Sequence, residues 1–442
     1  PPAHKQLLAV AGKPVELSLY RVVLESLSGA ASRVRFDFLA KVWYGATVNS
    51  VAMDASATLL AVGGEAKMVR LMQLPNWDLK PKSDMLAKKE AKPGDDSADH
   101  GGHKDSRNAK VSIREDNRED GRHAVLAHAF FSSSVVHSIA MTGAGDKLAI
   151  GSADRVAVWE IVRDSSGEMK CVEKLFNLDQ GTKEGAVAFD DSGDRLAIGA
   201  GLFCQVLSMI TGAPVRTLPR LDGRVRCVAL AQRGFQLILG GFDKHVSVFS
   251  ADEGARFFDF GEGPVTENCP SGTMGVFAVA ATDCDHTQMV AIGGEHSVDQ
   301  EFRGITRVYD MNTKRFLCEW LREKKVFALA FTRDGRQCAV GGYDSQVVVH
   351  DVFNDTVQAT LLYEAPNHQM AWIWTISFSA DSRRMAVGCW NYFVYVYDNV
   401  PEDDTADDDS TLEDEEDARG VALDRPRVLR TTAVMVYAES NR

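Results

Sequence analysis

The sequence predicts an all-β fold, a single β-propeller made of four-stranded antiparallel blades. Two observations lead to this prediction: a short apolar phrase recurs along the chain, and each copy lies between other apolar runs of strand length. After a long early gap the copies follow one another at roughly forty to fifty residues, the repeat length of a propeller blade. The eight copies of the phrase occupy residues 8–12, 60–64, 148–152, 196–200, 237–241, 290–294, 338–342 and 385–389.

Each repeat predicts its strands in a fixed order, which the repeat beginning at Val326 illustrates. A first run at 326–331 is followed by a polar turn at 332–336, the phrase at 338–342 and a third run at 347–350. These runs are rich in β-branched and aromatic residues and end at Gly, Asp or Asn, so they indicate strands rather than helices. A variable fourth strand leads into the next repeat.

The end of the phrase predicts a turn with a structural role. We expect its glycine to end the second strand and to allow a tight turn with positive φ. An Asp or Asn follows, and its side chain is expected to bond to the backbone of the turn rather than to act as a catalytic acid. The residues in this position are Asp154, Asp243, Asp344 and Asn391.

The repeats resemble those of the WD-repeat family over nearly all of the chain outside two insertions. The segments 331–335 and 378–382 are similar to the turn that follows the family's first strand, and 341–344 is similar to its second turn. The closing Trp-Asp pair is degenerate, and the Gly-His pair that often opens a repeat is missing. The pair appears as Trp159-Glu160, Tyr309-Asp310, His350-Asp351 and Tyr397-Asp398.

The number of repeats predicts eight blades in one ring. Seven repeats are nearly complete, and an eighth is split between the two ends of the chain: 7–22 supplies two strands and 432–437 supplies one. Joining these ends would close the ring and leave no long unpaired sheet edge. Seven blades with an added strand pair is the alternative. The seven repeats begin at Val48, Val136, Glu184, Val225, Val276, Val326 and Ile373.

We therefore interpret residues 1–442 as one propeller with two insertions. Residues 75–123 are polar and nearly free of large apolar side chains, which predicts a disordered-type insertion. Its His and Asp residues are expected to be hydrated rather than to hold a metal. Residues 401–420 are predicted to form an acidic loop, and 421–442 a ring-closing segment. The acidic run 402–417 accounts for most of the net charge of −13, and it is either a solvated loop or a tether for a basic partner.

Composition and motifs argue against several classes of function. The eight cysteines are scattered without a Cys-x-x-Cys pair, which predicts buried free thiols and a reducing, cytoplasmic compartment. No apolar run is long enough to span a membrane, so we expect no membrane insertion. The chain has no nucleophile elbow, phosphate loop or zinc-binding helix motif. We therefore expect no catalysis and no cofactor, and the acidic balance disfavours nucleic acid as a partner.

The start of each repeat supplies the predicted binding residues. In the family that the repeats resemble, the first strand is innermost, and its first residues contact partners at the mouth of the channel. Aromatic residues are concentrated there in three consecutive late repeats, beside two arginines, and this combination is typical of a binding hot spot. The predicted partner-binding residues are Asn49, His137, Arg224, Arg226, Phe277, Phe327, Trp372 and Trp374.

The sequence thus predicts a non-catalytic scaffold or a subunit of a larger assembly, which binds proteins or peptides at the channel mouth. Two alternatives remain open at this point. One is a propeller enzyme whose site lies at the channel mouth. The other is a regulatory propeller domain cut from a longer polypeptide, which the absence of an initiating Met suggests.

Overall fold

The computed structural model describes most of the repeat region of the chain, and nearly all of what it describes forms one compact unit. A second unit, 75–123, lies almost entirely outside the described residues. So do Asp243, the acidic segment after 401 and the two terminal segments, 7–22 and 432–437. The described residues are 34–75, 124–164, 169–179, 185–218, 221, 223–241, 246–260, 275–282, 288–298, 301–363 and 371–401.

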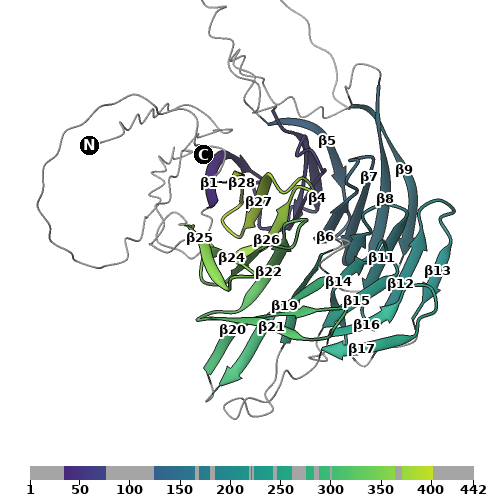
Figure 1. The fold of residues 1–442 in the computed structure, drawn as a ribbon. Helices are drawn as coiled ribbons and strands as arrows, with labels where there is room; N and C mark the ends of the chain where they lie inside the picture. The colour runs from purple at the N-terminus through teal and green to yellow at the C-terminus, as the bar shows by residue number, and fades with distance from the viewer. Residues whose placement is uncertain are drawn as a thin grey trace, which may run out of the picture. The chain divides into compact units, whose positions relative to one another are not determined.

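The described residues form seven four-stranded antiparallel sheets, which are the blades of a propeller (Figure 1). Blade 1 contains β2 (Val48–Met53), β3 (Leu59–Gly64), β4 (Met68–Gln73) and β5 (Val125–Phe131). Blade 2 contains β6 (Val136–Met141), β7 (Lys147–Ser152), β8 (Arg155–Arg163) and β9 (Met169–Asp179). Blade 3 contains β10 (Gly185–Phe189), β11 (Arg195–Ala200), β12 (Phe203–Ser208) and β13 (Pro214–Thr217).

The remaining blades continue in chain order until the last one. Blade 4 contains β14 (Val225–Ala231), β15 (Gln236–Gly241), β16 (Val246–Ser250) and β17 (Arg256–Phe260). Blade 5 contains β18 (Gly275–Ala281), β19 (Met289–Val298), β20 (Glu301–Asp310) and β21 (Phe316–Arg322). Blade 6 contains β22 (Val326–Phe331), β23 (Gln337–Gly342), β24 (Gln346–Asp351) and β25 (Thr356–Leu362). Blade 7 contains β26 (Ile373–Phe378), β27 (Arg384–Cys389), β28 (Phe393–Pro401) and β1 (Val34–Trp43).

The ring closes with seven blades. The prediction of a propeller is therefore confirmed, and its blade number is the alternative, seven, rather than eight. Each inner strand contacts the inner strand of the next blade, and β26 of blade 7 contacts β2 of blade 1, which leaves no gap for an eighth blade. Closure comes from β1, which pairs antiparallel with β28, from Val34 opposite Pro401 to Trp43 opposite Phe393. The sequence reasoning passed over this strand, although its alternating Phe36, Phe38, Ala40 and Val42 are all buried.

The recurrent phrase is apolar throughout because the second strand of a blade is covered on both faces. Every residue of β3, β23 and β27 is buried. Neighbouring blades pack on the two faces of these strands, so a continuous apolar run takes the place of the alternation expected of a half-exposed strand. Small and large residues alternate at the start of the phrase, and the alanine at its second position, for example Ala61 or Ala339, is fully buried.

The glycines that end the phrase are needed for close packing and not for positive φ, which corrects the expectation from sequence. A Cβ on Gly64 would lie 1.9 Å from the carbonyl oxygen of Thr47, and one on Gly342 would lie 2.0 Å from that of Lys325. Neither glycine has a positive φ. The left-handed residues of these turns come later, at Lys67 (54°) and Ser345 (60°). A side chain at either glycine would therefore push the start of the inner strand away from the second strand.

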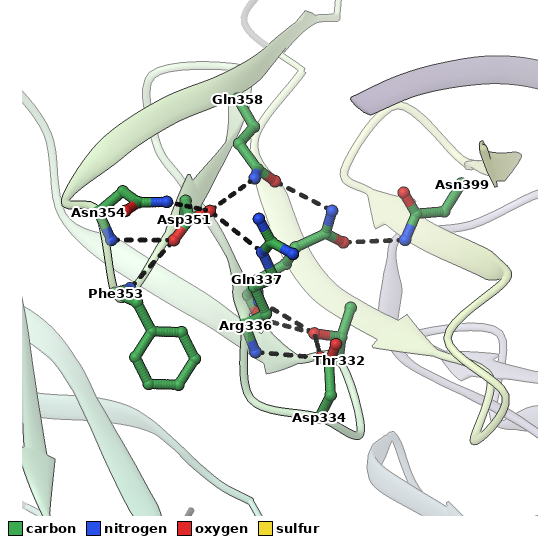
Figure 2. Close-up of polar contacts among 9 residues, drawn as sticks. All are labelled: Thr332, Asp334, Arg336, Gln337, Asp351, Phe353, Asn354, Gln358 and Asn399. Carbon is green, nitrogen blue, oxygen red and sulfur yellow. Dashed lines mark hydrogen bonds and ion pairs between the residues drawn. The ribbon is translucent and has the colours of Figure 1, made fainter. Parts of the chain in front are cut away.

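In blade 6, the aspartate of the degenerate Trp-Asp pair lies at the centre of a buried network of hydrogen bonds. Asp351 is fully buried at the end of β24. Its carboxylate accepts hydrogen bonds from the backbone N–H groups of Phe353 and Asn354, at 3.1 and 3.0 Å, and from the side-chain amide of Gln358 at 3.0 Å (Figure 2). The Arg336 side chain approaches the same carboxylate at 3.4 Å. This carboxylate therefore organises the turn between β24 and β25.

The same network joins blade 6 to blade 7. The side-chain amide of Gln337, at the start of β23, donates a hydrogen bond to Gln358 at 3.0 Å, and its oxygen Oε1 accepts one from Asn399 of β28 at 2.8 Å (Figure 2). Because β28 also pairs with β1, these bonds hold the closing blade in register with its neighbour.

The described part of the chain contains no helix that could cross a membrane.

Candidate partner-binding surface

Six of the seven inner strands contain a β-bulge close to their start. In blade 6, for example, Val326 is opposite Gly342 and Ala328 is opposite Gly341, so that Phe327 has no partner of its own. A bulge bends the strand and redirects a side chain. The residue left over in each bulge is one of those predicted to bind a partner: Asn49, His137, Arg226, Phe277, Phe327 and Trp374.

We call the end of the blades at which the inner strands begin the entry face. Because the strands are antiparallel, the second strand of each blade ends there and the turn to the third strand lies there as well. The bulge residues and these turns are therefore neighbours on the entry face. This arrangement brings together residues that are separated by tens of positions in the sequence.

Six aromatic residues on the entry face of blades 5, 6 and 7 form a continuous series of ring contacts. Phe277 stacks on Phe327 with ring centroids 4.8 Å apart, and Phe327 stacks on Tyr343 at 4.5 Å. Tyr343 stacks on Trp372 at 4.4 Å, and Trp372 contacts Trp390 at 5.0 Å. We call this set the aromatic strip, and it consists of Phe277, Phe327, Tyr343, Trp372, Trp374 and Trp390.

Trp374 lies against the middle of the strip. Its ring centroid is 5.0 Å from that of Phe327 and 5.9 Å from that of Tyr343. All six members of the strip are half-buried, and Tyr392, whose ring lies beside Trp390, is 44% exposed. The strip therefore packs against itself on one side and leaves aromatic surface open to solvent on the other.

The charged groups that border the strip are mostly paired with one another. Lys325 forms an ion pair with Glu295 at 2.5 Å, and Arg322 forms one with Asp344 at 2.6 Å. Arg322 also donates a hydrogen bond to the carbonyl of Val340 at 2.6 Å. Burial lowers the pKa of Arg322, while the Asp344 carboxylate opposes this shift and keeps the guanidinium charged.

The four remaining predicted partner residues do not share one environment. The side-chain amide of Asn49 donates a hydrogen bond to the carbonyl of Val136 at 2.9 Å, which joins blades 1 and 2. His137 is half-buried in β6. Arg224 is exposed and Arg226 half-buried at the start of β14, in the blade next to the strip. A role for these four residues in binding stays a prediction.

The three turn residues that the structure describes have structural partners, although these are not always the backbone of the turn. Asn391 accepts a hydrogen bond from the backbone N–H of Phe393 at 3.3 Å. Asp154 instead accepts hydrogen bonds from the hydroxyls of Ser133, Ser134 and Ser152, which together lower its pKa. Asp344 is held by Arg322, as described above.

Sequence reasoning missed two members of the strip, Tyr343 and Trp390. Both occupy the turn position between the end of the recurrent phrase and the Asp344 or Asn391 slot. Their signal was present, because a large aromatic in a turn of a repeat protein has no core to fill. The prediction did not include these two residues because it considered only the first strand of each repeat.

The buried thiols and the buried histidine have properties of core residues. Burial raises the pKa of the Cys204 and Cys318 thiols to about 12, so both stay protonated at neutral pH and are poor nucleophiles. Burial lowers the pKa of His350 to about 4, and its ring stacks on Trp320 at 4.0 Å. Among the described residues there is no group of three or more His, Cys, Asp or Glu side chains that could hold a metal ion.

Comparison with known proteins gives a match to the family model described as WD domain, G-beta repeat. It covers residues 317–351 and 359–398. Each matched stretch begins in the outer strand of one blade and continues through the first three strands of the next, from β21 to β24 and from β25 to β28. Residues 317–398 therefore carry WD repeats, and together with the ring of seven four-stranded blades they support a WD-repeat propeller. Comparison with curated proteins gave no significant match.

The offset between repeat and blade explains why adjoining blades are tied together. Each of the two matched stretches contributes its first strand to the preceding blade and so spans a blade boundary. Trp320 on β21 of blade 5 shows the consequence, because its indole donates a hydrogen bond to Asp355 of blade 6 at 2.7 Å. WD-repeat propellers are generally scaffolds for protein interaction and are typically not enzymes.

Proposed function

We propose that this WD-repeat propeller is a non-catalytic scaffold that binds a protein partner through the aromatic strip on its entry face. The observation that supports this most directly is the stacked series from Phe277 to Trp390, whose rings stay partly exposed across three blades. Large aromatic side chains on a rigid surface, when covered by a partner, contribute a disproportionate share of binding energy. The strip therefore has the composition of a hot spot.

Packing between blades does not account for the strip. Aromatic residues that fill space between blades here are almost fully covered, as Trp320 (7% exposed) and Phe36 (0%) show. Every member of the strip keeps solvent-accessible surface, and Tyr392 beside it is more exposed still. Exposed aromatic surface that extends over several elements is characteristic of an interaction site.

The strip is rigid before any partner arrives. Its rings are held by mutual stacking. The bulges that orient Phe277, Phe327 and Trp374 are fixed because the residues before and after each bulge pair with the second strand of the blade. A preformed surface loses little conformational freedom on binding, which favours affinity. This property suits a subunit that holds other chains in a larger assembly.

The test is the double variant Trp372→Ala/Trp374→Ala, with Phe203→Ala as the matched control. Phe203 is 52% exposed at the start of β12, also on the entry face but in blade 3. Proteins captured from the native source by the wild type and the control, but not by the double variant, are identified by mass spectrometry. Affinity is then measured with the purified partner.

We expect each lost tryptophan to weaken binding by about 2 kcal/mol or more. The melting temperature should change little, because both rings are partly exposed and lie outside the core clusters. If the tryptophans are structural, the double variant will instead lose about 3–5 kcal/mol of folding stability per ring. Loss of folding, without a specific loss of partner, would contradict the proposed function.

A further inference from the structure

A recess between blades 1 and 2 combines an apolar wall with a positive charge at its mouth. It lies where β5 leads into β6, at the entry face of both blades. Its enclosed part is small, about 30 Å³, so it can receive the end of one side chain but not a whole cofactor. We call it the seam recess, and its wall and mouth are formed by Phe130, Phe131, Ser132, Arg155, Ala157 and Trp159.

The recess exists because the third strand of blade 2 has a small side chain at one position. Ala157 of β8 pairs with Ile150 of the recurrent phrase. The space that Ala157 leaves is bounded by the rings of Phe130 and Trp159, whose centroids lie 4.9 Å apart. In the same register each of the other six blades has a larger residue, and these are Arg70, Gln205, Ser247, Arg307, Val348 and Tyr395.

Arg155 brings a positive charge to this apolar surrounding. It is half-buried and precedes Ala157 by two residues on β8, so both side chains lie on the same face of the strand. It forms no ion pair or side-chain hydrogen bond with any residue whose side chain the structure describes. Its chain neighbour Asp154 is engaged by three serine hydroxyls and does not line the recess. A half-buried guanidinium without a carboxylate favours an anionic ligand.

Ser132 adds a second hydrogen-bond donor at the mouth of the recess. Its hydroxyl oxygen accepts a hydrogen bond from the backbone N–H of Ser134 at 3.4 Å, and its hydroxyl hydrogen has no acceptor among the described residues. A carboxylate has two oxygens, one for the guanidinium of Arg155 and one for this hydroxyl. The mouth therefore suits a carboxylate better than a neutral polar group.

The apolar wall adds the requirement that an apolar side chain lies directly beside the carboxylate. The last residue of a protein chain carries both groups on one Cα atom. An internal Asp or Glu has its carboxylate at the end of the side chain and would bring that charge against the rings of Phe130 and Trp159. A free aliphatic acid also carries both groups, but it would gain only the few contacts that so small a recess offers.

We infer that the seam recess receives the C-terminal residue of a partner protein, whose apolar side chain enters beside Ala157 and whose terminal carboxylate binds Arg155 and Ser132. The recess belongs to blades 1 and 2 and is separate from the aromatic strip of blades 5, 6 and 7. This inference therefore goes beyond the proposed function and does not depend on it.

The binding test uses fluorescein-labelled ten-residue peptides with the full chain. The first pool ends in Leu, Ile or Val with a free carboxylate and has uncharged polar residues elsewhere. The second is the same pool with an amidated C-terminus, and the third ends in Ser with a free carboxylate. Fluorescence polarisation should show binding of the first pool about tenfold tighter than that of the other two. Equal affinities of the acid and amide pools would overturn the inference.

Competition with 4-methylpentanoate separates a chain end from a free acid, because this acid carries the same two groups without a peptide backbone. It should displace the first pool only at concentrations far above the dissociation constant of the peptides. Displacement at concentrations similar to that constant would assign the recess to free carboxylic acids and overturn the assignment to a chain end.

Two variants address the charge and the space separately. Arg155→Gln should weaken binding of the first pool about ten- to a hundredfold, the contribution of a charged hydrogen bond. Ala157→Val introduces the residue type that Val348 supplies in the same register of blade 6, so it should fold, and by filling the recess it should weaken binding about tenfold. Arg383→Gln, at an exposed position between β26 and β27, is the matched control and should have no effect. Wild-type affinity of Arg155→Gln or Ala157→Val would contradict the inference.

A spectroscopic measurement on the wild type covers the case in which a variant does not fold. In protein labelled with ¹⁵N-tryptophan, the Trp159 indole N–H resonance should move when the first pool is added and stay in place with the amidated pool. The resonance is identified by its absence from Trp159→Phe. An unmoved resonance shows that the peptide does not enter the recess and overturns the inference.

The strip variant keeps this test distinct from that of the proposed function. Trp372→Ala/Trp374→Ala should bind the first pool like the wild type, and loss of that binding would place the chain end on the strip and overturn the inference. If no pool binds while the same double variant abolishes partner capture, the inference is wrong and the proposed function stands.

Discussion

Closure of the ring by β1 can be tested at Phe36. This side chain is fully buried, and the residue pairs with Asn399 across the boundary between β1 and β28. It belongs to a core cluster that includes Val349 and Leu361 of blade 6 and Ile373 of blade 7. The substitution Phe36→Ala therefore removes contacts to two blades at the point where the ring is joined.

The expected loss of stability follows from burial. Truncation of a fully buried phenylalanine to alanine costs about 3–5 kcal/mol, because transfer energy is lost and a cavity remains. Relaxation around Phe36 should be limited. The neighbouring Phe38 is 8% exposed and is itself held between Tyr395 and Tyr397 by ring contacts at 6.4 and 5.7 Å. We therefore expect the upper half of this range.

The assay is urea unfolding of the full chain, followed by circular dichroism and tryptophan fluorescence. Phe131→Ala is the matched control, since Phe131 lies at the end of β5 and is 77% exposed. The control should shift the free energy of unfolding by less than about 0.5 kcal/mol. If Phe36→Ala unfolds like the control, β1 does not close the ring in solution and the seven-blade closure is wrong.

Two further predictions concern buried titratable groups of blade 6. Burial raises the pKa of Asp351, but the hydrogen bonds from Asn354 and Arg336 prevail and lower it. The contribution of the Asp351 carboxylate to the free energy of unfolding is therefore fully present above the pKa that it has in the unfolded state. This contribution is lost as the pH falls through the pKa of the folded state. Asp351→Asn should cost about 2–3 kcal/mol near pH 7 in urea unfolding and less in acid, and an equal cost at both pH values would refute this. His350, with its pKa lowered to about 4, takes up a proton first in the unfolded state, so stability falls by about 3 kcal/mol between pH 6.5 and 4. In His350→Phe, which keeps the stacking on Trp320, this component should vanish from the pH profile, and its persistence would show that other groups cause it.

The starts of the seven complete repeats could be predicted from sequence to within a residue or two. Val48, Val136, Val225, Val326 and Ile373 are the first residues of their inner strands. The reason is that the second strand is buried on both faces, which forces the same apolar phrase in each blade. Blade number was harder to predict, because 7–22 resembles a partial repeat, whereas β1 lacks the phrase although it completes the ring.

The candidate site was predicted in part, and the missing part has a geometric cause. Counting positions from the start of each repeat correctly brought Phe277, Phe327 and Trp374 to one face. It did not reveal the bulges, because a bulge is a property of the pairing between two strands. Nor did it include Tyr343 and Trp390, which reach the same face from a different turn.

The bulge and the glycine opposite it connect the fold to the surface we propose for binding. A glycine at 342 lets the Lys325 carbonyl come closer than any Cβ would allow, and the strand that is drawn in has Phe327 left over in its pairing with β23. The same pairing recurs with Gly294 and Phe277 in blade 5. In blade 7 the buried Cys389 occupies the corresponding position opposite Ile373, and Trp374 is left over. Close packing of the first two strands thus goes together with a bulge, which places on the entry face one inner-strand residue that has no opposite residue on the second strand. The fold specifies where that residue lies, while its chemical type is left to each repeat, and in three consecutive blades of this chain it is aromatic.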